Sequence, residues 1–163
     1  MRARSGGLFV GPPSAESGAG TLREALELFA GARVDIVFRA PRAELHRRMR
    51  EAAYLVLPSL SYQAEPRSLV EAFACGLPVI GSRLAGLAEW IEPGRNGLLF
   101  DPGSARDLAR RLAWAEAFPE KMRQMGECAQ ADYHARFVAD WGWQRLYGER
   151  RRQARDKWGR TPF

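Results

Sequence analysis

Residues 58–112 read PSLSYQAEPRSLVEAFACGLPVIGSRLAGLAEWIEPGRNGLLFDPGSARDLARRL, and this stretch decides the fold class. It holds two short apolar runs, Pro78–Ile80 and Gly97–Phe100, that do not alternate with polar residues. Continuous runs of this kind are typical of strands that are covered on both faces of a parallel sheet. Segments with helical spacing precede the first run and follow the second. The stretch therefore predicts an α/β unit.

The same alternation of apolar runs and helical patterns continues from this stretch toward the N-terminus. Parallel strands that are joined by helices form open sheets with helices on both faces. We therefore predict a Rossmann-like open parallel sheet of five strands, which are Leu8–Val10, Val34–Phe38, Tyr54–Leu57, Pro78–Ile80 and Gly97–Phe100.

Capping patterns predict where several helices begin. Three Ser/Thr-x-x-Asp/Glu patterns mark helix starts at Thr21–Glu24, Ser68–Glu71 and Ser104–Asp107. Gly76 predicts the end of the second of these helices, and apolar spacing predicts another helix over Glu44–Ala53. The C-terminal third is predicted as two helices, Pro119–Phe137 and Asp140–Lys157, the second with Trp141, Trp143, Leu146 and Tyr147 packed on one face.

The net charge is concentrated at the C-terminus. The chain has 163 residues, about one domain, and 25 basic and 19 acidic residues give it a net charge of +6. Residues 149–160 (ERRRQARDKWGR) hold six basic and two acidic residues, a net +4. We expect a domain over 1–148 and a basic helix end or tail over 149–163. We expect this tail to be solvated and not bound to nucleic acid, because no nucleic-acid motif accompanies it. Peripheral contact with anionic lipid at the inner face of a membrane stays open.

The remaining composition excludes several classes of protein. No apolar run approaches the roughly 18 residues of a spanning helix, and no signal peptide is visible, so we expect a cytoplasmic protein. Cys75 and Cys128 have neither disulfide-framework nor metal spacing. His46 and His134 lie in polar helical stretches, away from nucleophile or metal signatures. We expect no metal and no cofactor.

Three strand-to-helix loops are candidates for ligand binding, because ligands of open parallel sheets bind beyond the carboxyl ends of the strands. They are Gly11–Gly20, Pro58–Arg67 and Gly81–Glu89. The second loop leads into a helix whose free amides and positive dipole end suit a diphosphate. Glu71 near that helix start either binds two vicinal sugar hydroxyls or only completes the capping box with Ser68.

Residues 58–112 resemble the donor-binding half of GT-B glycosyltransferases, and more narrowly the retaining family 4 (group 1) enzymes that build bacterial polysaccharides and glycolipids. The family signature is "PS", a Glu, seven residues, "EA-A-G-PV", "G-E-I" and "G-GLL", and this stretch follows it closely. The likeness extends more weakly over about Leu8 to Tyr147. It implies that the chain is a single C-terminal half of such an enzyme.

The resemblance implies where a donor binds. Such enzymes bind a nucleotide-sugar in this half, the acceptor mostly in the N-terminal half, and they require no metal. Glu71 is then the ribose-binding Glu, amides around Ser68 and Leu69 face the diphosphate, and Gln63 stands where the family has its catalytic Glu. Gly11, Arg67 and Gly86 complete the expected donor-binding set. The implied ligands are a UDP-, GDP- or ADP-sugar and a sugar or lipid-linked acceptor.

The departures from the family pattern are as informative as the matches. Gln63 lacks the charge of the family's Glu, and Glu65 stands where the family usually has an aromatic residue. Pro12 and Ser17 replace the Arg and Lys that bind the diphosphate in the family. Charge-assisted hydrogen bonds are worth roughly 1.5–3 kcal/mol each, so the loss of two costs on the order of a hundredfold to ten-thousandfold in affinity or rate. Arg67 is the candidate for partial compensation.

Two parts of the family pattern have no match here. About thirty residues, a strand and a helix, are missing between the first predicted helix and Val34, where only Ala30–Arg33 stand. The acceptor-binding half has no match either, so we expect a fragment of a longer chain or a partner chain that supplies it. Three hypotheses follow. The chain is a glycosyltransferase donor domain, active or once active; a non-catalytic nucleotide-binding or scaffold module of the same descent; or a plain α/β interaction protein whose ligand is a macromolecule, which rests only on the basic tail. The missing Arg and Lys favour the second for this chain alone.

Overall fold

The computed structural model describes residues 4–62 and 66–138, which form a five-stranded parallel sheet with the strand order β2-β1-β3-β4-β5. The strands are β1 (Gly7–Val10), β2 (Val34–Val37), β3 (Tyr54–Leu57), β4 (Val79–Ser82) and β5 (Gly97–Phe100). The predicted Rossmann-like sheet is confirmed, and every strand begins and ends within two residues of its predicted bounds. The strand order reverses between β1 and β3, which makes the carboxyl ends of these two strands the switch point of the sheet.

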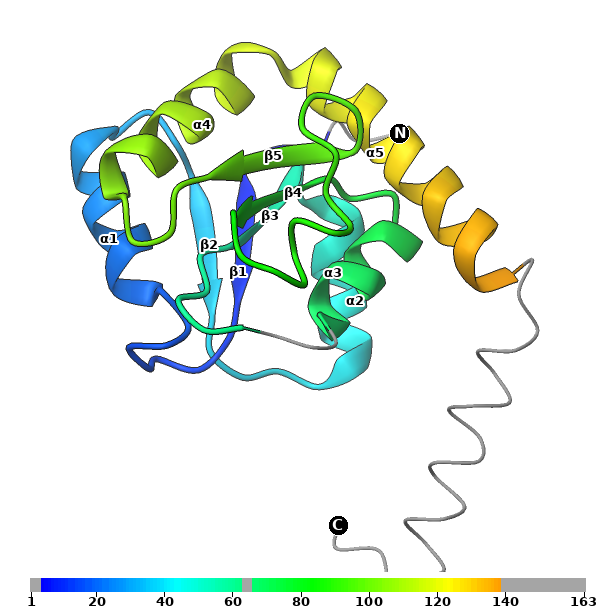
Figure 1. Ribbon diagram of the computed structural model, residues 1–163, viewed down its shortest axis with the longest axis horizontal. Coiled ribbons are helices and arrows are strands. Elements are labelled where there is room, and N and C mark those ends of the chain that lie inside the picture. Colours follow the sequence, from blue (N-terminus) through cyan, green and yellow to red (C-terminus); the bar gives the residue numbers. More distant parts are fainter. Residues whose placement is uncertain (1–3, 63–65, 139–163) are drawn as a thin grey trace, which may run out of the picture.

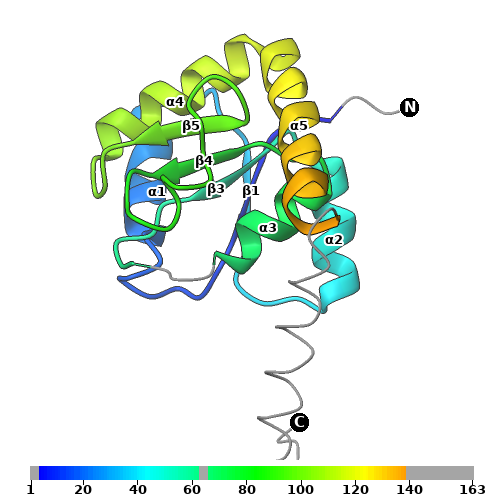
Figure 2. The same ribbon diagram turned by 45° about the vertical axis from the view of Figure 1, so that its right-hand side comes forward.

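Helices cover both faces of the sheet (Figure 1). One face carries α1 (Ala19–Leu28) and α4 (Ala105–Ala117), and the other carries α2 (Arg42–Glu51) and α3 (Arg67–Ala74). The last described α-helix, α5 (Pro119–Tyr133), runs along α3, as the turned view in Figure 2 shows. It ends in a π-helical turn, His134–Val138.

The two faces of the sheet bury two separate cores. Phe9 lies with α1 and α4 residues in one core, whereas its neighbour Leu8 lies with α2 and α3 residues in the other. Successive strand residues point to opposite faces, so strands with a core on each side must be apolar throughout. This explains why β3 and β5 are buried at all four positions and read as continuous apolar runs.

Only one of the three predicted helix starts is found where it was predicted, and there the Asp107 carboxylate accepts from the Asp101 amide and not from Ser104. The Ser104 hydroxyl accepts a hydrogen bond from the Asp107 amide at 3.1 Å and caps α4. The other two predictions are wrong, because α1 begins at Ala19 after Gly18, and α3 begins at Arg67 after Pro66. Neither of these two helices has a side-chain cap. Gly76 ends α3 in the left-handed conformation, as predicted, with φ of 65°.

The C-terminal third is described only in part. The predicted helix over Pro119–Phe137 is present as α5 and the π-helical turn. The predicted helix Asp140–Lys157, its aromatic residues and the basic tail over 149–163 lie outside the described residues. Among the helices that are described, every one is too short or too polar to cross a bilayer.

Candidate functional site: the carboxyl edge of the sheet

Two of the predicted ligand-binding loops lie against each other at the carboxyl edge of the sheet. The Leu60 amide, after β3, donates to the Glu16 carbonyl in the β1–α1 loop at 2.8 Å. Gly18 lies so close to Pro58 that a β-carbon at Gly18 would stand 1.7 Å from the Pro58 carbonyl oxygen. These contacts bring the first and second loops together at the switch point, where open α/β sheets bind ligands.

The start of α3 presents donors to this edge. Val70 is the first α3 residue whose amide bonds within the described chain, to the Pro66 carbonyl at 3.1 Å. The amides of Arg67, Ser68 and Leu69 donate to no acceptor among residues 4–62 and 66–138. The Arg67 side chain is exposed and forms no ion pair with any described residue. Amides without an acceptor among the described residues, a helix dipole and a guanidinium are the features that suit a helix start to an anion.

Glu71 lies one turn along α3 and faces α2. Its Oε1 is 3.2 Å from Nη2 of Arg42 and 3.7 Å from Nε2 of His46, and its side chain is 17% exposed. Because α3 begins at Arg67, Glu71 does not complete a capping box with Ser68. The carboxylate lines a groove of about 530 Å³ between α2, α3 and α5.

Arg42 and His46 are neighbours of Glu71 that the sequence pattern did not predict. Both lie on α2, four residues apart and therefore on one face of the helix. Their position in the helix after β2 could have placed them near the site, because a helix that follows a parallel strand begins at the carboxyl edge of the sheet. With Arg42, Arg50 and Arg4 around a single carboxylate, the groove is predominantly basic.

The other expected donor-binding residues lie on separate loops. Gly11 follows β1, and its amide donates to the Val37 carbonyl at 3.2 Å. Gly86 lies between β4 and β5 with φ of 93°, a conformation that L-residues rarely adopt. Its neighbour Leu87 packs in the same core as Leu69 of α3. Gln63 lies outside the described residues, as does Glu65.

The first loop has no cation at its tip. The Ser17 hydroxyl donates to the Ser14 carbonyl at 2.8 Å, and the Ser17 amide donates to the Ser14 hydroxyl at 3.2 Å. The serine side chains therefore hold a local turn, and Pro12 is exposed before it.

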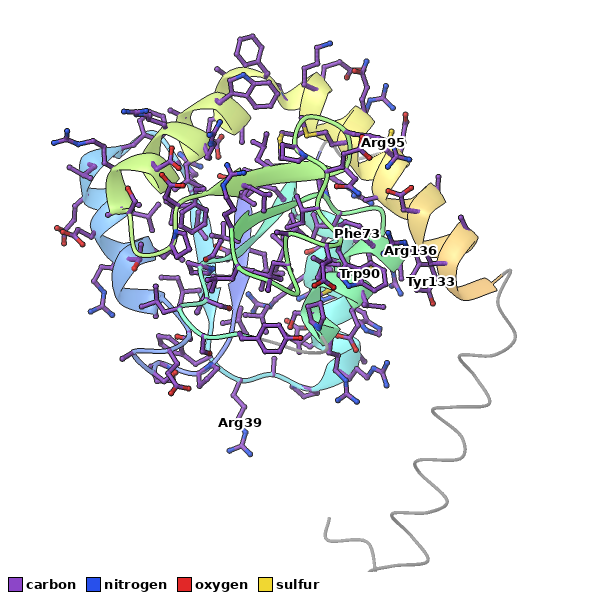
Figure 3. The ribbon with its side chains drawn as sticks, viewed as in Figure 1. Arg39, Phe73, Trp90, Arg95, Tyr133 and Arg136 are labelled. Atoms are coloured by element: carbon purple, nitrogen blue, oxygen red, sulfur yellow. The ribbon has the colours of Figure 1, made fainter. Side chains whose placement is uncertain are left out.

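A second hollow, between the β4–β5 connection and α5, has a structural role. Arg95 donates to both carboxylate oxygens of Asp132, at 2.6 and 2.7 Å, and the buried Asn96 donates to Asp132 at 2.8 Å. Arg136 lies 4.4 Å from the ring centre of Trp90, and Figure 3 shows these side chains gathered beside α5. Asn96, which directly precedes β5, thus helps to attach α5 to the β4–β5 connection.

Metal and thiol chemistry have little support in the described part of the chain. It contains no group of three or more His, Cys, Asp or Glu side chains that could hold a metal ion. Cys75 and Cys128 are free thiols and both are half-buried. His46 is beside Glu71, and His134 begins the π-helical turn.

Comparisons with known proteins agree with this architecture. The family model described as "Glycosyl transferases group 1" matches residues 8–132. The amylovoran biosynthesis glycosyltransferase AmsK of Erwinia amylovora is 38% identical over 92 residues, which cover 52% of this chain and 23% of AmsK. The chain thus spans about a quarter of the length of this relative.

Two solved structures are similar to the chain along most of its length. HepE of Anabaena in complex with UDP has a TM-score of 0.69 and 25% identity, and the match covers 83% of this chain and 45% of HepE. The C-terminal domain of the group 1 glycosyl transferase LpcC of Francisella tularensis has a TM-score of 0.65 and 15% identity. That match covers 82% of this chain and 86% of the LpcC domain, which shows the fold of a C-terminal-type domain.

Proposed function

Because the chain belongs to the group 1 glycosyl transferases, we propose that it is the nucleotide-sugar donor-binding domain of a retaining hexosyltransferase. The donor is a UDP-, GDP- or ADP-sugar, and the acceptor is a growing polysaccharide or a glycolipid. The UDP in the HepE complex supports a nucleotide-sugar as the donor. The name of AmsK, a biosynthesis glycosyltransferase, supports a biosynthetic role. The acceptor binds against a second domain, in a longer chain or in a partner chain.

The observation that carries this proposal is the start of α3. The amides of Ser68 and Leu69 have no acceptor among the described residues, and together with the exposed guanidinium of Arg67 they favour a diphosphate at this point. Glu71 lies one turn further, at a distance that suits a ribose attached to that diphosphate. A carboxylate accepts hydrogen bonds only, so it suits a pair of vicinal hydroxyl donors.

The chemistry assigned to this chain is stabilisation of the leaving diphosphate. As the bond to the sugar breaks, negative charge develops on the diphosphate, and the α3 amides are oriented toward that charge before the reaction begins. Arg67 adds a full positive charge at the same helix start. Gly11 and Gly86 belong to the proposed crevice as positions of close backbone approach, and Gln63 is the proposed counterpart of the family's catalytic carboxylate.

The proposed donor site is weak in this chain. Pro12 and Ser17 provide no charge to the diphosphate, and the Ser17 hydroxyl is already bonded to Ser14. Arg42 is 3.2 Å from the carboxylate that is assigned to the ribose, so a nucleotide has to share Glu71 with it. These observations also favour a second candidate function, a non-catalytic nucleotide-binding or scaffold module of the same family.

Calorimetric titration with UDP, GDP and ADP tests the donor site. We expect binding that is weaker than micromolar for the native chain, and a loss of at least about tenfold for Glu71→Ala, since a charged hydrogen-bond acceptor is removed. Glu24→Ala on the exposed side of α1 is the matched control and should bind as the native chain does. Micromolar binding that Glu71→Ala leaves unchanged would show that Glu71 does not hold the ribose.

A further inference from the structure

Arg42 is the first residue of α2, and its guanidinium reaches a carboxylate on α3. Nη2 of Arg42 is 3.2 Å from Oε1 of Glu71, but the Arg42 side chain is 70% exposed whereas that of Glu71 is 17% exposed. Ion pairs with a partner in contact with water contribute little free energy, because the solvent screens the charges and the long side chain loses conformational freedom. The pair therefore breaks at small cost, and Arg42 can exchange its partner.

The Glu71 carboxylate lies beside the first turn of α3. Side chains on an α-helix lean toward its N-terminus, and residues three and four apart lie on one face. Arg67 and Ser68 precede Glu71 by four and three residues, so they share its face of α3. The Arg42 guanidinium at this carboxylate is therefore within about one helical turn, or roughly 5 Å, of the start of the helix.

The arginines around α2 differ in whether a ligand at α3 can engage them. Arg47 is held between Glu44 and Glu51 of its own helix, at 2.7 and 2.9 Å. Arg39, which precedes α2, projects away from the domain in Figure 3. Arg42 has one carboxylate partner among the described residues, on α3, and a guanidinium has further donors for a second group. Arg42 is thus placed to contact a ligand at the start of α3, whereas Arg39 and Arg47 are not.

A diphosphate at the start of α3 receives no cation from the first loop. Pro12 carries no charge, and the Ser17 hydroxyl donates to the Ser14 carbonyl at 2.8 Å. A diphosphate carries more than one negative charge, so Arg67 by itself leaves part of that charge unbalanced. A second guanidinium within one helical turn of Arg67 would supply the missing charge-assisted hydrogen bonds.

We propose that Arg42 changes its partner when the donor binds, so that the ribose hydroxyls bind Glu71 and the Arg42 guanidinium binds the diphosphate. The hydroxyls donate to Glu71, and the carboxylate therefore keeps hydrogen-bond donors after Arg42 leaves. Arg42 exchanges a weak surface ion pair for a charge-assisted hydrogen bond to phosphate, which is one of the stronger kinds in proteins. The inference rests on the proposed function, because it takes the ribose and the diphosphate to lie along α3.

Calorimetric titration with UDP, GDP and ADP tests this exchange in the full native chain and in its Arg42→Gln variant. For each nucleotide that binds the native chain, Arg42→Gln should weaken binding about tenfold, because the loss of a charge-assisted hydrogen bond outweighs the release of Glu71. Arg47→Gln, the same substitution in an exposed ion pair of α2, is the matched control and should bind within about twofold of the native chain. Unchanged or tighter binding by Arg42→Gln would overturn the inference, since Arg42 would then only occupy Glu71.

The matching nucleoside, which has the ribose and no phosphate, separates contact with the diphosphate from a general role in shaping the site. In a titration followed by NMR, Arg42→Gln should bind the nucleoside at least as tightly as the native chain does, because Glu71 is released and no contact with phosphate is lost. A loss equal to that for the nucleotide would overturn the inference, because Arg42 would then maintain the shape of the site. A native chain that binds none of the three nucleotides would contradict the proposed donor site itself, so the two failures are distinguishable.

Discussion

Asp132 is the side chain through which α5 is attached to the β4–β5 connection. It accepts two hydrogen bonds from Arg95 and one from Asn96, which is itself 2% exposed and also donates to the Trp90 carbonyl. The bonds from Arg95 lower the pKa of Asp132, and Asn96 adds to this against the opposing effect of partial burial. The folded pKa therefore lies below the unfolded value of about 3.9. The stabilisation is complete above that pH and is lost as pH falls through the folded pKa.

Asp132→Asn should lower the free energy of unfolding at pH 7 by about 1–2 kcal/mol, since charge-assisted hydrogen bonds are lost from a pair that is partly exposed. The difference between variant and native chain should shrink as pH falls from about 5 to 3, because Asp132 of the native chain becomes protonated there. Urea unfolding at several pH values measures both effects. Glu127→Gln, which breaks an exposed pair on the same helix, should cost about 0.5 kcal/mol or less. A difference that stays constant with pH would contradict the role of the Asp132 charge.

Two glycines that are two residues apart in the chain should respond in opposite ways to the same substitution. Gly18 has φ of 74°, and a β-carbon there would overlap the Pro58 carbonyl oxygen, so Gly18→Ala should destabilise the protein by at least about 2 kcal/mol. Gly20 lies inside α1, and a β-carbon there would meet no atom within 4 Å, so Gly20→Ala should stabilise the protein by up to about 1 kcal/mol. Chemical denaturation of both variants is the measurement. Equal effects would mean that the close approach of the two loops is not constrained by Gly18.

Local sequence patterns predicted the strands more accurately than they predicted the starts of the helices. Apolar runs located all five strands, because burial on both faces of a parallel sheet leaves a signal in each run by itself. Thr21–Glu24 and Ser68–Glu71 follow the capping pattern, yet α1 and α3 begin earlier, after a left-handed Gly18 and after Pro66. The partners of Glu71 on α2 are 29 and 25 residues away in the chain. Such a contact depends on how two helices pack, and no spacing within either helix predicts it.

At the scale of the whole molecule, the proposed function assigns to the described residues one side of a cleft between two domains. The matched structure of HepE is more than twice as long as the region that it shares with this chain, since the match covers 45% of it. In the family pattern the acceptor approaches from the other half. Holding two reactants in the correct geometry supplies roughly 7–11 kcal/mol of barrier reduction in favourable cases, and the proposed site of this domain would hold only the donor. Under the proposed function, we therefore expect donor binding and sugar transfer to be separable.

We predict that the isolated chain transfers no sugar. An acceptor-binding half is needed to orient a nucleophile. Pro12 and Ser17 replace the cations that would stabilise the leaving diphosphate. Gln63 replaces a carboxylate that faces the transferred sugar in the family. Incubation with labelled UDP-, GDP- and ADP-sugars should give neither transfer nor donor hydrolysis above the Glu71→Ala variant. The double substitution Pro12→Arg and Ser17→Lys should tighten nucleotide binding by about tenfold or more, because it restores charge beside the diphosphate, and it should still give no transfer. Turnover above the Glu71→Ala level by the native chain would show that one domain is sufficient for the reaction.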